Sequence, residues 1–208
     1  MNHTPSPSRR ALALIAAGLS AVGVAGAAAL TLGLTAASGA TVSHGDRSFS
    51  FALKPSGTIA SCLPHAGGRV TITAGSLNDT MTVSVHGMPA SSGFDLFVIQ
   101  RPTKPFGVAW YQTDVNVNRD GNGSATVRGV FSVETFSVSL GGSATFAPTH
   151  QYHLGLWFNN PRTPFNLGCE PGATVPVVTP FNGEQHAGIQ VLNTAQFPVN
   201  AGPLSHVH

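Results

Sequence analysis

Apolar and polar residues alternate with a period of two through most of the chain beyond residue 40, and Gly, Pro, Asn and Ser cluster between the alternating runs. This period is typical of β-strands with one buried face, because successive side chains of a strand point to opposite sides. No helical period extends over twelve residues there. The runs predict about nine strands, at residues 49–53, 70–72, 81–85, 94–99, 108–117, 124–130, 131–140, 152–158 and 189–192.

Many short strands separated by turn residues favour an all-β fold, and specifically an antiparallel β-sandwich. Charged residues make up only 9% of the chain, which excludes a long helical bundle because its solvent faces need charge. A disordered chain is excluded by the 42% hydrophobic content and the 12 Phe, which can form a core. We therefore expect one sandwich domain at residues 41–208, with one long Pro-rich loop.

Residues 1–40 have the pattern of a helical export leader. Arg9 and Arg10 precede an uncharged apolar stretch at 11–34, and Ser38-Gly39-Ala40 offers small residues for a signal peptidase. The paired arginines are similar to a twin-arginine signal. An uncleaved membrane anchor at 11–34 is the alternative, since a span needs about 20 apolar residues. Either interpretation predicts a secreted or cell-envelope protein.

The charge of the remaining chain limits its partners. Arg9 and Arg10 are the only charged residues of the leader, so eight basic and eight acidic residues remain beyond it. No basic run is left, which argues against nucleic acid and against an anionic membrane surface. We expect no membrane span in the mature chain unless the leader is retained.

Two cysteines, Cys62 and Cys169, stand 107 positions apart. In an exported chain such a pair predicts a disulfide. Cys169 lies within residues 158–188, which hold five prolines. A long loop inside a compact domain is uncommon and is often functional, and the predicted disulfide would hold this one in place.

The Pro-rich loop predicts the binding site. It contains Thr-Pro-Phe-Asn twice, at 163–166 and 179–182, and Pro105-Phe106 is a looser relative. In one interpretation the Phe rings are plugs at the end of the sandwich. In the other they form a rim with nearby amides that stacks on a small molecule, a glycan or a protein. The rim residues are Trp157, Asn159, Asn160, Phe165, Phe181, Glu184 and His186.

The enzyme alternative depends on two pairs of residues. Asp95 and Glu134 lie in apolar strands, where they would pair with Arg101 or Arg128, be exposed, or act as catalytic carboxylates. Glu184 and His186 form another possible acid and base pair.

No nucleophile elbow, phosphate loop or dinucleotide motif is present, so we predict no cofactor and no catalytic residue. Residues 116–123 are similar to the start of a calcium loop, but a hairpin tip explains them equally well. The His residues are scattered, and no metal site is expected.

Several segments carry a resemblance to known proteins. The chain resembles uncharacterised secreted proteins of high-GC Gram-positive bacteria in Gly-Phe-Asp-Leu-Phe-Val-Ile-Gln at 93–100 and Leu-Gly-Leu-Trp-Phe at 154–158. The resemblance continues in Pro-Phe-Gly at 105–107 with Trp-Tyr-Gln at 110–112, and in Pro-Phe-Asn-Gly at 180–183 with Ala-Gly-Ile-Gln at 187–190. A strand followed by Gly-Met-Pro at 87–89 is similar to immunoglobulin-like sandwiches in architecture only. The resemblance implies export and a single domain, and it brings no activity. We therefore expect a non-enzymatic binding or structural module of the cell exterior.

Overall fold

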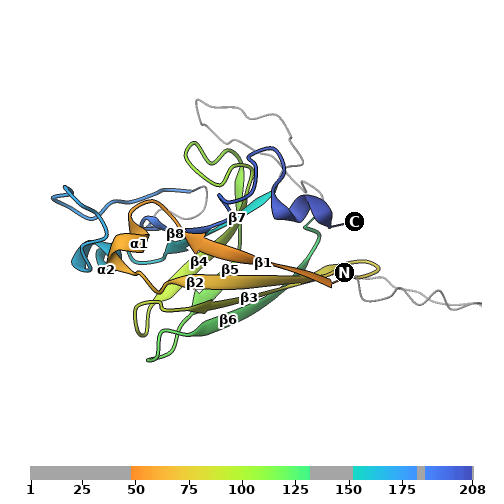
Figure 1. Ribbon diagram of the computed structural model, residues 1–208, viewed down its shortest axis with the longest axis horizontal. Helices are drawn as coiled ribbons and strands as arrows, with labels where there is room; N and C mark the ends of the chain where they lie inside the picture. Colours follow the sequence, from red (N-terminus) through yellow and green to blue (C-terminus); the bar gives the residue numbers. More distant parts are fainter. Residues whose placement is uncertain (1–47, 132–151, 182–185, 208) are drawn as a thin grey trace, which may run out of the picture. The chain divides into compact units, whose positions relative to one another are not determined.

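The computed structural model describes residues 48–131, 152–181 and 186–207 (Figure 1). The predicted leader lies outside these residues. So does the predicted strand at 131–140, apart from Phe131. Candidate residues Glu134 and Glu184 also fall outside the described ranges.

The described chain is all-β, as the alternation predicts. Eight antiparallel strands follow the order β5-β4-β7-β8-β1-β2-β3-β6. The sheet nearly closes on itself, because a bridge between Val117 and Gly123 joins the ends of its two edge strands. The strands are β1 (Ser48–Pro55), β2 (Gly67–Thr73), β3 (Asp79–His86), β4 (Gly93–Ile99), β5 (Ala109–Asn116), β6 (Gly123–Gly129), β7 (His153–Phe158) and β8 (Gln190–Asn193).

Three short helical segments interrupt the strands: α1 (Ile59–Cys62), α2 (Arg162–Asn166) and the 3₁₀ turn η1 (Pro203–His206). Each has four or five residues, which is too short to produce a helical period in the sequence. Figure 1 shows α1 and α2 close together at one end of the strands. The loops that carry them are those that contain the two cysteines.

The main core lies on the inner face of the sheet. Val70 of β2, Val83 of β3 and Leu156 of β7 are fully buried in it, and every strand contributes side chains. These residues occupy the apolar positions of the alternating pattern. On β6 the polar positions Ser124, Thr126 and Arg128 are exposed, so the expected inside and outside faces are present there.

A second apolar cluster covers the outer face of β4 and β7. Phe97, Trp157 and Phe181 form its centre, with ring centroids 4.3 to 5.5 Å apart. All six residues of β7 are consequently buried. The alternation of β7 therefore separates two buried faces, rather than one buried face and one exposed face.

The two hairpin loops of the β4–β5–β6 region are held by side-chain amides. The Oε1 of Gln100 accepts a hydrogen bond from the Val108 N–H at 2.9 Å, which closes the loop that carries Phe106. At residues 117–122, the Oδ1 of Asn118 accepts from the N–H groups of Asp120 and Asn122, both at 3.0 Å. This arrangement agrees with the hairpin interpretation of that segment.

The C-terminal segment packs against the beginning of β7. The His153 ring is fully buried, with its Nδ1 3.0 Å from Thr194 Oγ1 and its Nε2 3.4 Å from the Val199 carbonyl oxygen. Burial lowers the pKa of this imidazole, and hydrogen bonds to the backbone offset only part of that effect. A Cβ at Gly202 would lie 1.9 Å from the Tyr152 carbonyl oxygen, so only glycine allows this approach.

Candidate functional site

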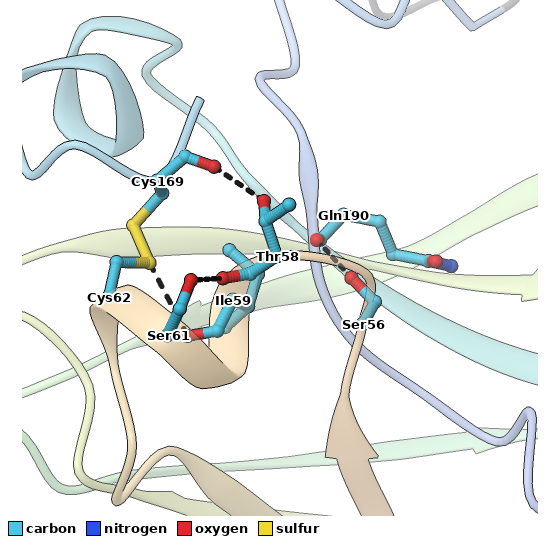
Figure 2. Close-up of a disulfide and its surroundings, with 7 residues drawn as sticks. All are labelled: Ser56, Thr58, Ile59, Ser61, Cys62, Cys169 and Gln190. Atoms are coloured by element: carbon cyan, nitrogen blue, oxygen red, sulfur yellow. Dashed lines mark hydrogen bonds between the residues drawn. A yellow bond between two sulfur atoms is a disulfide. The ribbon is translucent and has the colours of Figure 1, made fainter. Parts of the chain in front are cut away.

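The predicted disulfide between Cys62 and Cys169 is confirmed, with the two Cα atoms 5.2 Å apart (Figure 2). It joins the end of α1 to the residues that follow α2. Hydrogen bonds reinforce the connection, because the Thr58 hydroxyl donates to the Cys169 carbonyl at 2.6 Å. The Ser56 hydroxyl donates in the same way to the Gln190 carbonyl of β8. The early turn after β1 is thus attached to two late segments of the chain.

The Pro-rich loop is also held by contacts of its own. The Cys169 N–H donates to the Pro164 carbonyl at 3.0 Å, and the Val177 N–H donates to Glu170 Oε2 at 2.9 Å. Further along, the Thr179 N–H donates to the Ala187 carbonyl at 2.7 Å. Between these points the loop exposes Val175, Val177 and Val178.

The two Thr-Pro-Phe-Asn segments have different conformations. The first forms most of α2, and its Phe165 is half-buried. The described part of the second is non-helical, and its Phe181 stacks on Phe97 at 4.3 Å. Phe106 lies 6.1 Å from Phe181 in the same cluster. The plug interpretation therefore describes Phe181 and Phe106, while Phe165 lies elsewhere.

The predicted rim residues separate into a buried set and an exposed set. Trp157 is 0% exposed and Phe181 is 9% exposed, so these rings pack beneath the surface and offer no open face to a ligand. Asn159, Asn160 and His186 are exposed. Of the residues of the rim interpretation, the amides reach the surface, whereas the Trp157 and Phe181 rings are buried in the second cluster.

Asn159 and Asn160 line a polar cavity of about 400 Å³, which we call the amide groove. One wall is the turn before β4, and the other consists of the first residues of the Pro-rich loop and α2. None of the lining residues is charged. They are Pro89, Ala90, Ser91, Ser92, Gly93, Asn159, Asn160, Thr163, Asn166 and Leu167.

Local backbone contacts fix the amides of this groove. The Asn160 Oδ1 accepts a hydrogen bond from the Arg162 N–H at 3.0 Å, which orients the side chain at the start of α2. The Asn159 N–H donates to the Gly93 carbonyl at 3.2 Å. A Cβ at Gly93 would lie 2.2 Å from Asn159 Nδ2, so the glycine makes room for that amide. Asn166, the last residue of α2, is exposed on the same wall.

A second cavity, of about 350 Å³, lies beside the disulfide-linked turn, and we call it the β8 pocket. Its walls come from the turn after β1, the β4–β5 loop, the Pro-rich loop and β8. Its lining residues are Ser56, Gly57, Thr58, Ile59, Thr103, Lys104, Phe106, Thr179, Ile189, Gln190 and Asn193. The sequence contains no local motif for this pocket, because four distant segments build it. The disulfide indicated one wall, and the recurring Pro-Phe segments contain two further lining residues, Phe106 and Thr179.

Each pair of the enzyme alternative has one member outside the described residues, Glu134 in the first pair and Glu184 in the second. Asp95 is 4% exposed, which excludes one of its three alternatives, an exposed carboxylate on the outer face of the strand. It lies on β4 opposite Asp114 of β5 and Trp157 of β7. Among the described residues, no three His, Cys, Asp or Glu side chains come together as metal ligands.

No protein-family model matches this chain, and no curated protein sequence matches it either. Within the described parts of the chain, no helix has the length and apolar character needed to cross a membrane.

Proposed function

We propose that this protein is an exported, non-enzymatic binding module whose amide groove takes a neutral, hydroxyl-rich ligand such as a glycan. The observation that carries the proposal is the composition of the groove. Asn159, Asn160 and Asn166 lie around one cavity with the hydroxyl residues Ser91, Ser92 and Thr163.

The chemistry of these side chains suits sugar hydroxyls. Each Asn amide has both donors and an acceptor, and each Ser or Thr hydroxyl can do either. A sugar hydroxyl is likewise a donor and an acceptor, so neutral polar groups can match it without burying a charge. Leu167 adds an apolar side, which can contact the C–H face of a sugar ring. The part of the lining that the structure describes contains no carboxylate, imidazole or thiol, which favours binding over acid–base catalysis.

We further propose that the domain is a two-layer sandwich outside the cytoplasm. β1 supports the layered arrangement, because it pairs with β2 along most of its length and with β8 only at Lys54 and Pro55. The disulfide supports export, because such bonds persist in oxidising compartments. Intact mass of the exported protein should show the loss of residues 1–40 and of two hydrogen atoms. A full-length mass would favour the anchored alternative, and a fully reduced mass would argue against export.

The binding proposal is tested by ¹⁵N NMR titration of the exported protein with a panel of neutral oligosaccharides. At least one should shift the backbone signals of Ser91, Ser92 and Asn160. The variant Asn166→Ala should weaken that binding about threefold to tenfold, since one hydrogen bond is worth about 1 kcal/mol. Asn200→Ala is the matched control, because Asn200 is exposed and lies outside the groove.

Three results of this titration contradict the proposal. The first is that no oligosaccharide shifts the groove signals, and the second is that the two Asn variants weaken binding equally. In the third, signals shift mainly on another surface of the domain.

A further inference from the structure

The β8 pocket has a chemical character opposite to that of the amide groove. Among the described residues, its lining includes one charged side chain, Lys104, and no Asp or Glu. Lys104 is exposed, and among the described residues no carboxylate forms a salt bridge with its ammonium group. The nearby Glu170 follows Cys169 in sequence, but it lies outside the lining, and its Oε2 accepts from the Val177 N–H.

Gln190 supplies the second polar feature of the pocket. Its Oε1 accepts a hydrogen bond from Asn193 Nδ2 at 2.9 Å, which fixes the direction of the amide. Its Nε2 is buried and has no hydrogen-bond partner among the described residues. A buried donor without an acceptor is unfavourable, so a small shift of this amide that lets a ligand acceptor reach the N–H group would be stabilising. Figure 2 shows the Gln190 amide pointing away from the disulfide.

The hydroxyl groups nearest the disulfide do not compete for this donor. Those of Ser56 and Thr58 donate to the carbonyls of Gln190 and Cys169, which keeps both side chains in fixed directions. Thr103 and Thr179 add two more hydroxyl groups to the lining. The polar side of the pocket is therefore rich in donors and carries a positive charge.

The remaining wall of the pocket is apolar. Phe106 is half-buried, and its ring meets Trp157 edge-on at 5.0 Å, so the second cluster supports it from behind. Ile59 and Ile189 complete this side. The volume of about 350 Å³ is at the small end of the range for ligand sites.

We infer that the β8 pocket binds a small organic carboxylate with an apolar body. The carboxylate accepts hydrogen bonds from the Lys104 ammonium and, after a small shift of the Gln190 amide, from its Nε2, and the apolar body lies against Phe106. This site is separate from the amide groove and does not depend on the function proposed there.

Benzoate and benzamide are suitable probes because they have nearly the same shape and differ in charge. In a ¹⁵N NMR titration of the oxidised protein up to about 10 mM, benzoate should shift the signals of Gly57, Phe106 and Gln190. Benzamide should bind at least about fivefold more weakly, because it lacks the charge that Lys104 attracts. Equal binding of the two probes, or no shift of the pocket signals by benzoate, would overturn the inference.

Two variants assign the interaction to its donors. Lys104→Gln should weaken benzoate binding about fivefold, whereas Arg119→Gln, which removes a charge from the exposed hairpin, should leave it unchanged. Gln190→Glu keeps the acceptor for Asn193 but replaces the donor with a repelling carboxylate, so benzoate binding should be lost.

The alternative outcomes are distinguishable. Equal weakening by Lys104→Gln and Arg119→Gln would reduce the effect to general charge attraction and would contradict the site. Retained binding in a folded Gln190→Glu variant would contradict it as well. Benzoate shifts confined to Asn160 and Asn166 would place the anion in the amide groove and would also overturn the assignment.

Discussion

The two faces of β7 are both buried, but they are covered in different ways. On the inner face, Leu154, Leu156 and Phe158 pack against residues of the other strands in the main core. On the outer face, Trp157 is covered by Phe106 and Phe181, which come from loops. His153 is covered by the segment that contains Thr194 and Val199.

This difference separates two sources of stability. Strands that cover the inner face are held in register by backbone hydrogen bonds to their neighbours along the whole sheet. Loops that cover the outer face are held at a few points, such as the disulfide and the Thr179–Ala187 hydrogen bond. We therefore expect inner-face changes to affect global unfolding and outer-face changes to affect local opening first.

The largest effect should follow Leu156→Ala on the inner face. Leu156 is fully buried among strands that cannot close around a cavity, so the substitution should lower the free energy of unfolding by about 4 kcal/mol. Urea denaturation measures this loss. Leu167→Ala is the matched control, since Leu167 is 43% exposed. This substitution should lower the free energy of unfolding only slightly. Similar losses for the two variants would show that the inner face is not tightly packed.

Removal of the disulfide should come next. The double variant Cys62→Ala/Cys169→Ala releases a link that closes 107 residues, and we expect a loss of about 3 kcal/mol. Limited proteolysis should show new cleavage around Val175 and Val178 before any in β2 or β3, because the loop loses an attachment point. A uniform rise in cleavage throughout the domain would contradict the expectation that the loops of the outer face open before the strands unfold.

Phe181→Ala should have a smaller effect than an inner-face change. The loop can move inward to fill part of the space, so we expect a loss of about 2 kcal/mol, below the usual cost for a buried Phe. Trp157 fluorescence should shift as its cover is lost. Phe165→Ala, in the same tetrapeptide sequence, should cost less than about 0.5 kcal/mol, because Phe165 is half-buried on α2. Equal losses of unfolding free energy in the two variants would mean that both Phe rings are plugs.

The smallest effect should be a change in pH dependence. Because the pKa of His153 is lowered in the folded state, the unfolded chain takes up the proton first as pH falls. The stability is therefore present above the ordinary His pKa of about 6.5 and decreases as pH falls toward the folded value. His153→Gln should flatten the curve of unfolding free energy below about pH 6.5. His65→Gln is the control, since His65 is exposed. An unchanged curve for His153→Gln would assign the acid response to other groups.

The strands could be predicted because their information is local. The pattern around Met81, Val83 and Val85 places β3 correctly, since each apolar residue marks the inner face by itself. The loop residues that cover the outer face of β7 could not be predicted in the same way. Nothing near Trp157 indicates that Phe106 and Phe181 lie over it, because both come from loops of different parts of the chain.

The candidate sites show the same limit. The position of Asn159 and Asn160 at the start of a Pro-rich loop was a local signal, and the structure places both in the amide groove. The β8 pocket combines Thr58, Lys104 and Gln190, which no spacing rule connects. The sequence left two interpretations of the aromatic rings open, plug or rim, because no local pattern shows that Phe106 and Phe181 cover the outer face of β4 and β7.

The position of β8 has a consequence for the timing of folding. It lies between β7 and β1, so the last strand of the described chain joins the first one, with Asn193 opposite Lys54. This pairing cannot form until the ribosome has added residues 192 and 193, more than 130 positions after the end of β1. A nascent chain that ends before residue 190 has no partner for the end of β1 and no neighbour for the free side of β7. Such non-local pairing slows folding, so the domain should acquire its native state only after β8 has been synthesised.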